Sequence, residues 1–320
     1  MNGPVRRWSR GAIRALQVLV AVGLLALVWR ATDGAEAARR LAATDWRWLV
    51  PALLALTLQV ILSALRWRLT ARQLGIHLGK GLAIREYYLS QLVNQSLPGG
   101  MVGDAARAVR SRDQAGLMAA GQAVVFERLA GQIALFILCA GAFVATLAVP
   151  GGLDWPPGVA LAVGILLAGV IGVVMILARL RHLPGATGRL AGRLRDAVHL
   201  SLASPSVLPG QIMLSIGTTF CILAAFAFCA RAVDVSLGFT AVAALVPLVL
   251  FTMLIPISIS GWGLREGAAA ALLPIAGVPV GGAIAASVVF GLTAIVTILP
   301  GAALVWIRPS MKPPAPDPAD

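Results

Sequence analysis

Long apolar runs alternate with short basic segments along the chain. A helix needs roughly 18 or more apolar residues to cross a hydrocarbon core of about 30 Å. Runs of that length lie near residues 12–30, 48–65, 118–149, 157–178, 209–230, 240–257 and 280–306. The pattern therefore predicts an all-α fold, namely a polytopic helical membrane protein with seven clear spans.

Two shorter apolar pieces, 82–98 and 259–276, contain or adjoin Pro and Gly. Broken helices occur at membrane depth only where protein or a cavity surrounds them. We therefore expect broken or re-entrant segments at these two places, and the sequence leaves open whether either crosses the membrane fully.

Lys and Arg are unevenly distributed between alternate connecting segments, which predicts the orientation of the chain. If the N-terminus is cytoplasmic, most of the 26 Lys and Arg residues lie inside. The outside segments then hold only Arg30, Arg39, Arg40, Arg47 and Arg231. We expect 82–98 to enter and leave on the cytoplasmic side, and about eight transmembrane helices with both termini cytoplasmic, in a bacterial-type cytoplasmic (inner) membrane.

The chain divides into a polytopic membrane domain, residues 1–308, and a Pro-rich tail, residues 309–320, which we expect to be disordered. Residues 186–202 fit either an interfacial cytoplasmic helix or a solvated basic loop. The N-terminal run also fits a cleaved signal peptide, but the many later spans favour an uncleaved first helix.

Composition agrees with a membrane protein and argues against several chemistries. Hydrophobic residues make up 59% and charged residues 12%, and the mean hydropathy is +0.88. The Lys and Arg residues behind the net charge of +13 lie mostly in segments on one predicted side of the membrane. The charge therefore does not indicate a nucleic-acid partner. Phosphate-loop, paired-aspartate and metal-ligand spacings are missing from the sequence, so we expect no cofactor, no metal and no enzyme activity.

Six charged residues lie at or near membrane depth, where each costs roughly 2.5 to 3.5 kcal/mol at the centre of a spanning helix. They are Asp104, Arg107, Glu127, Arg128, Arg265 and Glu266. One explanation is purely structural, with internal salt bridges or snorkelling to the interface. The other explanation is a substrate site.

The two breaks resemble each other, which favours the substrate site. In each, a proline (Pro98 or Pro256) is followed five residues later by a glycine (Gly103 or Gly261) and then by charged residues. Paired interruptions of this kind are typical of transporters with inverted repeats, whose site lies where the broken helices meet. The repeat halves are 48–149 and 209–306. The helices that begin after the two breaks have positive N-terminal ends, which attract an anionic group such as phosphate.

Three segments carry a resemblance to a known family. "YYLSQLVNQSLPGGMVGDAARAVR", "FERLAG" and "PISISGWGLREGA" resemble the hallmark segments of the lysylphosphatidylglycerol synthase transmembrane-region family, which are flippase-like integral membrane proteins. The resemblance implies movement of lipids or lipid-linked head groups between leaflets. We expect the stand-alone form that lacks the synthase domain, so aminoacyl transfer is not carried over.

The family's motif positions correspond to a defined set of residues here. These are Asn94, Pro98, Gly103, Asp104, Arg107, Glu127, Arg128, Pro256, Gly261, Gly263, Arg265 and Glu266. Gly99 and Gly100 are counted with the prolines and glycines of the two breaks as backbone-break residues. The segment "SLPGGMVGD" departs from the family pattern before its Gly-Asp pair, which makes the ligand contact of the first motif less defined than that of the second.

These observations lead to a hypothesis for the site. Arg265 binds the phosphate of a lipid head group, and Glu266 orients Arg265 or pairs with Arg107 or Arg128. Asn94, Asp104 and Glu127 complete the substrate-binding set. Proton coupling through Glu127 or Glu266 is left open.

The alternative function is a non-transporting protein that binds a membrane lipid and presents it to a lipid-modifying partner enzyme. Neither the lipid, the direction, the energy source nor the oligomeric state follows from the sequence.

Overall fold

A computed structural model of the protein describes residues 23, 34–96, 101–148, 153–180, 192–193, 195–255, 258 and 260–304. These residues form helices and turns, with no β-strand among them, which confirms the all-α class. Several predicted features lie outside the described residues. They are nearly all of the span at 12–30, Pro98, Gly99, Gly100, Pro256, the tail at 309–320, and residues 186–191 and 194 of the segment at 186–202.

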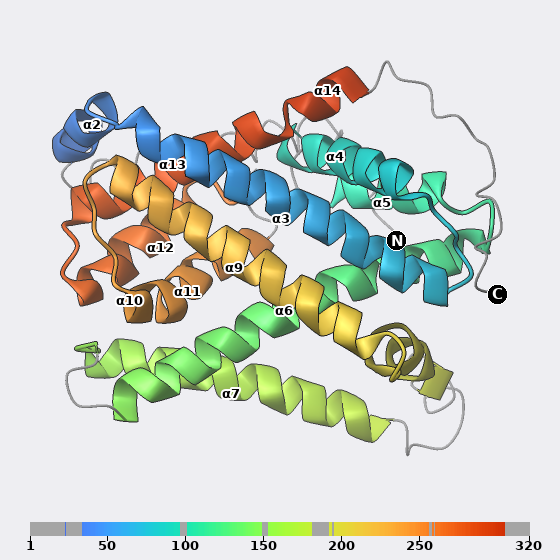
Figure 1. Cartoon of the computed structure of the whole chain (residues 1–320). Coiled ribbons are helices and arrows are strands. Elements are labelled where there is room, and N and C mark those ends of the chain that lie inside the picture. Colours follow the sequence, from blue (N-terminus) through green and yellow to red (C-terminus); the bar gives the residue numbers. More distant parts are fainter. Residues whose placement is uncertain are drawn as a thin grey trace, which may run out of the picture. The chain divides into compact units, whose positions relative to one another are not determined.

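Five described helices are long and apolar enough to cross a membrane (Figure 1). Their spans are Trp46–Gln73 (α3), Gly116–Ala148 (α6), Pro157–Ile176 (within α7, Pro157–Leu180), Leu208–Ala232 (α9) and Val280–Ala303 (α13, Val280–Ile298, with the start of α14, Pro300–Leu304). They confirm the predictions at 48–65, 118–149, 157–178, 209–230 and 280–306. The protein is therefore a multi-pass membrane protein.

The predicted span at 240–257 is divided in the structure. It comprises α10 (Phe239–Ala244), α11 (Val246–Phe251) and the 3₁₀ turn η2 (Thr252–Leu254). Pro247 stands in the first turn of α11, where its missing N–H and fixed φ favour a new helix start over continuation of α10. The apolar run is therefore shorter and more broken than its hydropathy predicts.

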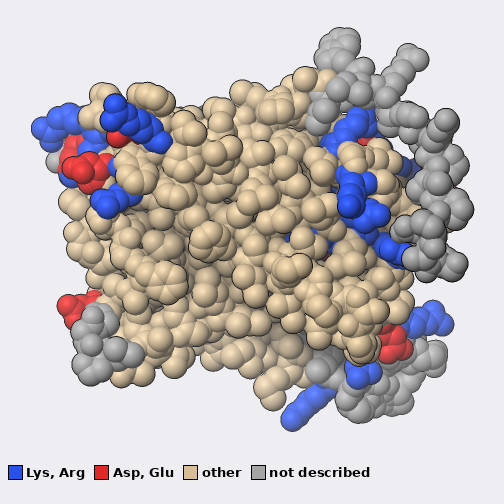
Figure 2. Space-filling model, viewed as in Figure 1, with Lys and Arg blue, Asp and Glu red and all other residues tan. Residues whose placement is uncertain are grey.

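The outward surfaces of the long helices are apolar, as lipid contact requires. Exposed side chains include Leu54 and Leu58 of α3, Ile137 of α6, Ile165 of α7 and Phe220 of α9. Figure 2 shows a broad surface of uncharged residues between groups of charged side chains. Burying these faces in hydrocarbon removes the cost of exposing them to water.

The first predicted break joins two antiparallel helices, α4 (Lys80–Ser96) and α5 (Val102–Arg110). Ser90 of α4 bonds Asp104 of α5, and Glu86, one turn earlier, pairs with Arg110 at the far end of α5. In these two contacts the residue number falls along α4 as it rises along α5, so the two helices form a hairpin. Gly103 permits it, because a Cβ there would collide with the carbonyl oxygen of Ser90.

The second predicted break has the same outline. After α11 and η2 the chain turns and returns as α12 (Leu264–Leu272), which packs against α11, η2 and α13 and is followed by the turn η3 (Leu273–Ala276). Ser260, Gly261 and Gly263 have φ of 51°, 80° and 84°, a left-handed region that favours glycine. The two glycines therefore form the turn with little strain, whereas Ser260 is held there by its surroundings.

The remaining elements are the short helix α2 (Gly34–Ala42), which packs against α13, and the π-helical turn η1 (His199–Ala203) before α9. By contacts, the described residues form two units. Unit 1 takes residues from 1–57, 88–106 and 223–308, and unit 2 from 58–87 and 107–222. Each unit is described separately below.

Candidate functional site

The charged residues predicted at membrane depth are almost all buried. Arg107, Glu127 and Glu266 are 0% exposed, Arg265 is 1% and Asp104 is 5% exposed. Arg128 is half-buried. Charges removed from water in this way need ion-pair and hydrogen-bond partners to be tolerated.

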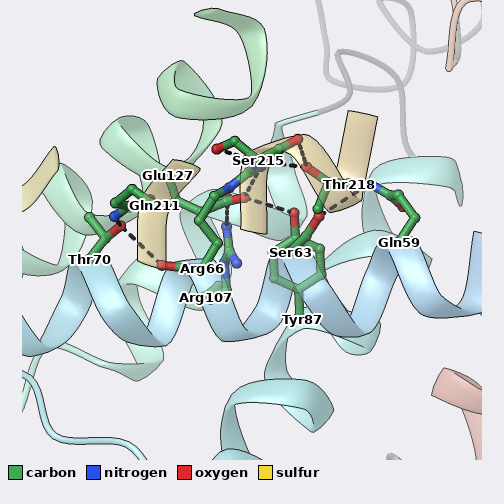
Figure 3. Close-up of polar contacts among 10 residues, drawn as sticks. All are labelled: Gln59, Ser63, Arg66, Thr70, Tyr87, Arg107, Glu127, Gln211, Ser215 and Thr218. Atoms are coloured by element: carbon green, nitrogen blue, oxygen red, sulfur yellow. Dashed lines mark hydrogen bonds and ion pairs between the residues drawn. The ribbon is translucent and has the colours of Figure 1, made fainter. Parts of the chain in front are cut away.

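In unit 2, Glu127 of α6 joins side chains from three other elements. Its Oε1 accepts hydrogen bonds from Arg66 Nη2 of α3 at 2.8 Å and from the Tyr87 hydroxyl of α4 at 3.3 Å. Its Oε2 lies 3.5 Å from Arg107 Nη2 of α5. We call Arg66, Tyr87, Arg107 and Glu127, drawn in Figure 3, the Arg66 cluster.

Aromatic rings hold the second guanidinium of this cluster. The Arg107 guanidinium carbon lies 4.4 Å from the centroid of the Trp67 ring and 4.5 Å from that of Tyr87. A guanidinium over an aromatic face is attracted by the ring quadrupole, and more strongly when both are desolvated. The Trp67 and Tyr87 rings therefore hold the Arg107 guanidinium beside Glu127.

Arg66 is held by α9 as well as by α6. Its Nη1 donates to Thr218 Oγ1 at 2.9 Å and to Ser215 Oγ at 3.4 Å. The α6 backbone lies close by, because a Cβ added to Gly131 would stand 2.6 Å from Arg66 Nη2. Two hydroxyls, a carboxylate and a close glycine therefore set the position of the Arg66 guanidinium.

In unit 1, the α4–α5 hairpin holds Asp104 at the start of α5. Asp104 accepts hydrogen bonds from Ser90 Oγ at 2.9 Å and from Asn94 Nδ2 at 3.3 Å. The Gly103 N–H donates to Asn94 Oδ1 at 2.8 Å. The two side-chain donors therefore fix the position of the Asp104 carboxyl group at the start of α5.

The other predicted pair, Arg265 and Glu266, forms a closed set of contacts within unit 1. Arg265 Nη2 donates to Glu266 Oε1 at 2.7 Å and Arg265 Nε donates to Ser287 Oγ of α13 at 3.0 Å. Ser287 in turn donates to Glu266 Oε1 at 3.0 Å. The Gly263 N–H donates to Glu266 Oε2 at 2.6 Å, so Glu266 also caps α12.

Aromatic residues again flank the arginine. The Arg265 guanidinium carbon lies 5.1 Å from the centroid of the Trp262 ring and 5.5 Å from that of Phe290. Gly291 of α13 makes room, since a Cβ there would collide with both Arg265 and Trp262. Glu266 orients Arg265, which is one of the two arrangements expected from the sequence.

The two breaks approach each other within unit 1. Ser260 of the second break donates a hydrogen bond to the Gln95 side-chain oxygen, at the end of α4 just before the first break. This contact joins the two predicted breaks within unit 1.

The predicted site residues therefore fall into three groups. Asn94 lies with Asp104, and Arg265 with Glu266, both in unit 1, whereas Arg107 lies with Glu127 in unit 2. Residues not singled out from the sequence complete these groups: Arg66, Tyr87, Ser90, Ser215, Thr218 and Ser287. Within the described part of the chain, no group of three or more His, Cys, Asp or Glu residues could hold a metal ion.

Arg66 is not predicted as a site residue, because the predicted apolar run at 48–65 ends one residue before it. The structure continues α3 to Gln73. The signal that identifies Arg66 is the polar spacing Gln59, Ser63, Arg66 and Thr70 on one face of that helix.

A family model described as "Lysylphosphatidylglycerol synthase TM region" matches residues 14–301. A comparison with curated proteins found no match. The family match spans every residue of the charged groups described above.

Proposed function

Because the chain belongs to the lysylphosphatidylglycerol synthase transmembrane-region family, we propose that it is a membrane lipid transporter. It moves a lipid or lipid-linked head group, anionic in character, between leaflets through a polar groove. The observation that carries this proposal is the Arg66 cluster, in which Arg66 and Arg107 share the buried Glu127 carboxylate.

A guanidinium pair suits a phosphate. Arginine presents a planar fork of donors that matches phosphate oxygens, and serine or threonine hydroxyls add further donors. Arg66 already bonds two such hydroxyls, those of Ser215 and Thr218. In the proposal, a phosphate takes the place of Glu127 on the arginines, and Glu127 returns when the head group leaves.

The Arg265 pair has a parallel role. Arg265 binds the head-group phosphate when Glu266 releases it, and Ser287 keeps the pair oriented between these events. Adjacent Trp262 and Phe290 exclude water from the guanidinium, which strengthens its attraction for an anion. Asn94 and Asp104 hold the α4–α5 hairpin, and Arg128 of α6 contributes to the polar groove.

The order of elements supports a transporter with an internal repeat. A long helix, a broken hairpin and a second long helix follow each other as α3, α4–α5 and α6, and again as α9, α10–α12 and α13. Transporters built from inverted repeats rock one repeat against the other. We further propose that the protein lies in an inner-membrane type of bilayer with both termini cytoplasmic. It performs no catalytic step of its own.

The test is leaflet translocation of labelled lipids in liposomes that contain the purified protein. Wild type is compared with Arg265→Ala, Glu266→Gln and Glu127→Gln, with Arg112→Ala as control because Arg112 lies in an exposed surface pair. Transport by wild type and the control, with loss in the three folded variants, supports the proposal.

If no lipid of the panel moves, with or without a proton gradient, the protein instead binds a lipid for a partner enzyme. The panel includes anionic phospholipid, aminoacylated lipid and polyprenyl-linked sugar, so the same experiment narrows the class of substrate.

A further inference from the structure

The part of α3 in unit 2 carries four polar side chains on one face of an otherwise apolar helix. Gln59, Ser63, Arg66 and Thr70 follow each other at intervals of four, three and four residues. This spacing repeats the period of an α-helix, so the four side chains lie in a row along its axis. Ser63, Arg66 and Thr70 are buried.

A second row on α9 faces the first. Gln211, Ser215 and Thr218 follow at intervals of four and three residues and are buried. The rows run in opposite directions and bond each other, since Gln211 Nε2 donates to Thr70 Oγ1 at 2.9 Å and Arg66 donates to Ser215 and Thr218. We call these seven residues, all labelled in Figure 3, the α3–α9 seam.

Hydrogen bonds within α3 lengthen the row. Gln59 Nε2 donates to Ser63 Oγ at 3.2 Å, and Thr70 Oγ1 donates to the Arg66 carbonyl at 3.0 Å. The seam reaches the Arg66 cluster through Arg66 itself, which lies in its middle. The result is a polar line along two membrane helices that meets a buried ion pair at its middle.

Glycines let the two helices approach beside the polar rows. A Cβ added to Gly217 would lie 2.9 Å from Leu62 Cδ1, and one added to Gly210 would lie 3.0 Å from Leu69 Cδ2. Small residues at such positions allow close packing of membrane helices. The seam is therefore closed in this structure, with its polar side chains bonded to each other.

Several polar atoms of the seam and its end lack a partner among the described residues. They are Arg66 Nε, Gln211 Oε1 and Ser201 Oγ, all buried. Ser201 belongs to η1, and its carbonyl accepts a bond from Gln211 Nε2 at 3.1 Å. Buried polar atoms are as a rule hydrogen-bonded, so these atoms have hydrogen-bonding capacity left for a further partner.

We propose that the α3–α9 seam is the surface along which the polar head group of the transported lipid passes. When α3 and α9 separate, the hydroxyl, amide and guanidinium groups that now bond each other bind oxygens of the head group instead. The acyl chains stay outside, against the apolar faces of the same helices. This inference rests on the proposed function and assigns its route.

The residue types restrict the class of head group. The seven residues include one guanidinium, hydroxyls and amides and contain no carboxylate. They suit a phosphate followed by hydroxyl groups, as in glycerol or sugar head groups. A head group with an additional positive charge would be repelled by Arg66. The seam holds no acidic residue to offset this repulsion, and Glu127, beside the seam, already pairs with Arg66. The seam therefore favours anionic, hydroxyl-rich head groups over cationic aminoacylated ones.

Cysteine accessibility tests the opening without relying on transport. Cys139, Cys221 and Cys229 are replaced by alanine, and single cysteines are introduced as Ser63→Cys, Thr70→Cys and Leu58→Cys. Ser63 and Thr70 are 0% exposed, whereas Leu58 on the same helix is 47% exposed on its apolar face. The probe is a charged, membrane-impermeant methanethiosulfonate added to proteoliposomes.

We expect Ser63→Cys and Thr70→Cys to react at least about tenfold faster than Leu58→Cys, since local opening exposes the seam to water and lipid covers Leu58. Seam cysteines that react no faster than Leu58→Cys would overturn the inference. This result is independent of any transported lipid.

Cross-linking tests the role of the opening in transport. A bifunctional methanethiosulfonate joins Leu69→Cys to Gly210→Cys, which lie opposite each other on α3 and α9 beside the polar rows and are not seam residues. The control joins Phe143→Cys to Trp155→Cys, whose rings lie 5.0 Å apart in unit 2 away from the seam. We expect the seam cross-link to abolish movement of labelled phosphatidylglycerol, reduction to restore it and the control cross-link to leave it unchanged.

Transport that continues through the cross-linked seam contradicts the route but leaves the proposed function standing. If wild type moves no lipid at all, the proposed function fails, and the accessibility measurement still decides whether the seam opens. A faster rate for a lysylated lipid than for phosphatidylglycerol would overturn the assignment of the head group.

Discussion

Arg66 of α3 donates a 2.8 Å hydrogen bond to Glu127 of α6, sixty-one residues away, and both side chains are buried. A buried ion pair is expensive to form and more expensive to break, because removal of one member leaves an uncompensated charge in a medium of low dielectric.

Glu127→Gln is expected to destabilise the folded protein by about 3–5 kcal/mol, because Arg66 and Arg107 both lose their shared carboxylate. Thermal unfolding in detergent measures the change. Glu86→Gln serves as control, since Glu86 is an acid of α4 in ion pairs outside the cluster. An equal, small effect of both substitutions would argue against the Arg66 cluster as a coupled unit.

Gly131→Ala is expected to reduce transport, because its Cβ would stand 2.6 Å from Arg66 Nη2 and displace the guanidinium. The matched control is Gly121→Ala in the same helix, where nothing lies within 4 Å. The control should gain roughly 0.5–1 kcal/mol of stability from the better helix former. Equal transport by the two variants would contradict the close approach of Arg66 to α6.

Ser287→Ala is expected to cost about 1–3 kcal/mol, because Arg265 Nε loses one of its two acceptors, keeping only Glu266 Oε1, and Glu266 Oε1 loses a donor in a buried place. Chemical denaturation measures the loss. Thr297→Val in the same helix is the control, since the Thr297 hydroxyl bonds only the carbonyl of Thr293 in the described contacts. A Ser287→Ala variant as stable as the control would show that the serine does not hold the pair.

Gly103→Ala is expected to destabilise the α4–α5 hairpin by about 1–3 kcal/mol, since the added methyl group collides with the Ser90 carbonyl oxygen. Hydrogen exchange of α5 reports the local loss. Gly81→Ala, in α4 with nothing within 4 Å of the added Cβ, should leave exchange unchanged. Unchanged protection of α5 in Gly103→Ala would mean that the hairpin packs differently.

Hydropathy predicted most of the fold because a membrane span depends on a long apolar run. Five spans were predicted near their observed positions, and the charged residues after the breaks were expected near membrane depth. The segment at 240–257 differs from the predicted single span, because a hydropathy average does not detect a helix break. The break near Pro247 divides the segment into α10 and α11.

The partners of the charged residues were less predictable. Glu127 finds Arg66 through the packing of α6 on α3, and one sequence contains no record of such a long-range contact. Arg265 and Glu266 are neighbours, which usually point apart on a helix. They meet here because Ser287 of α13 and the first turn of α12 hold both side chains.

The most direct test of the account separates the charges of the cluster from its packing. The triple variant Arg66→Met, Arg107→Met, Glu127→Leu removes all three charges of the cluster and fills their space with apolar atoms, a change that is often neutral for stability. Its rate of moving labelled phosphatidylglycerol between leaflets is measured in proteoliposomes beside wild type. The account predicts a folded protein that moves no lipid, whereas movement at the wild-type rate would contradict it.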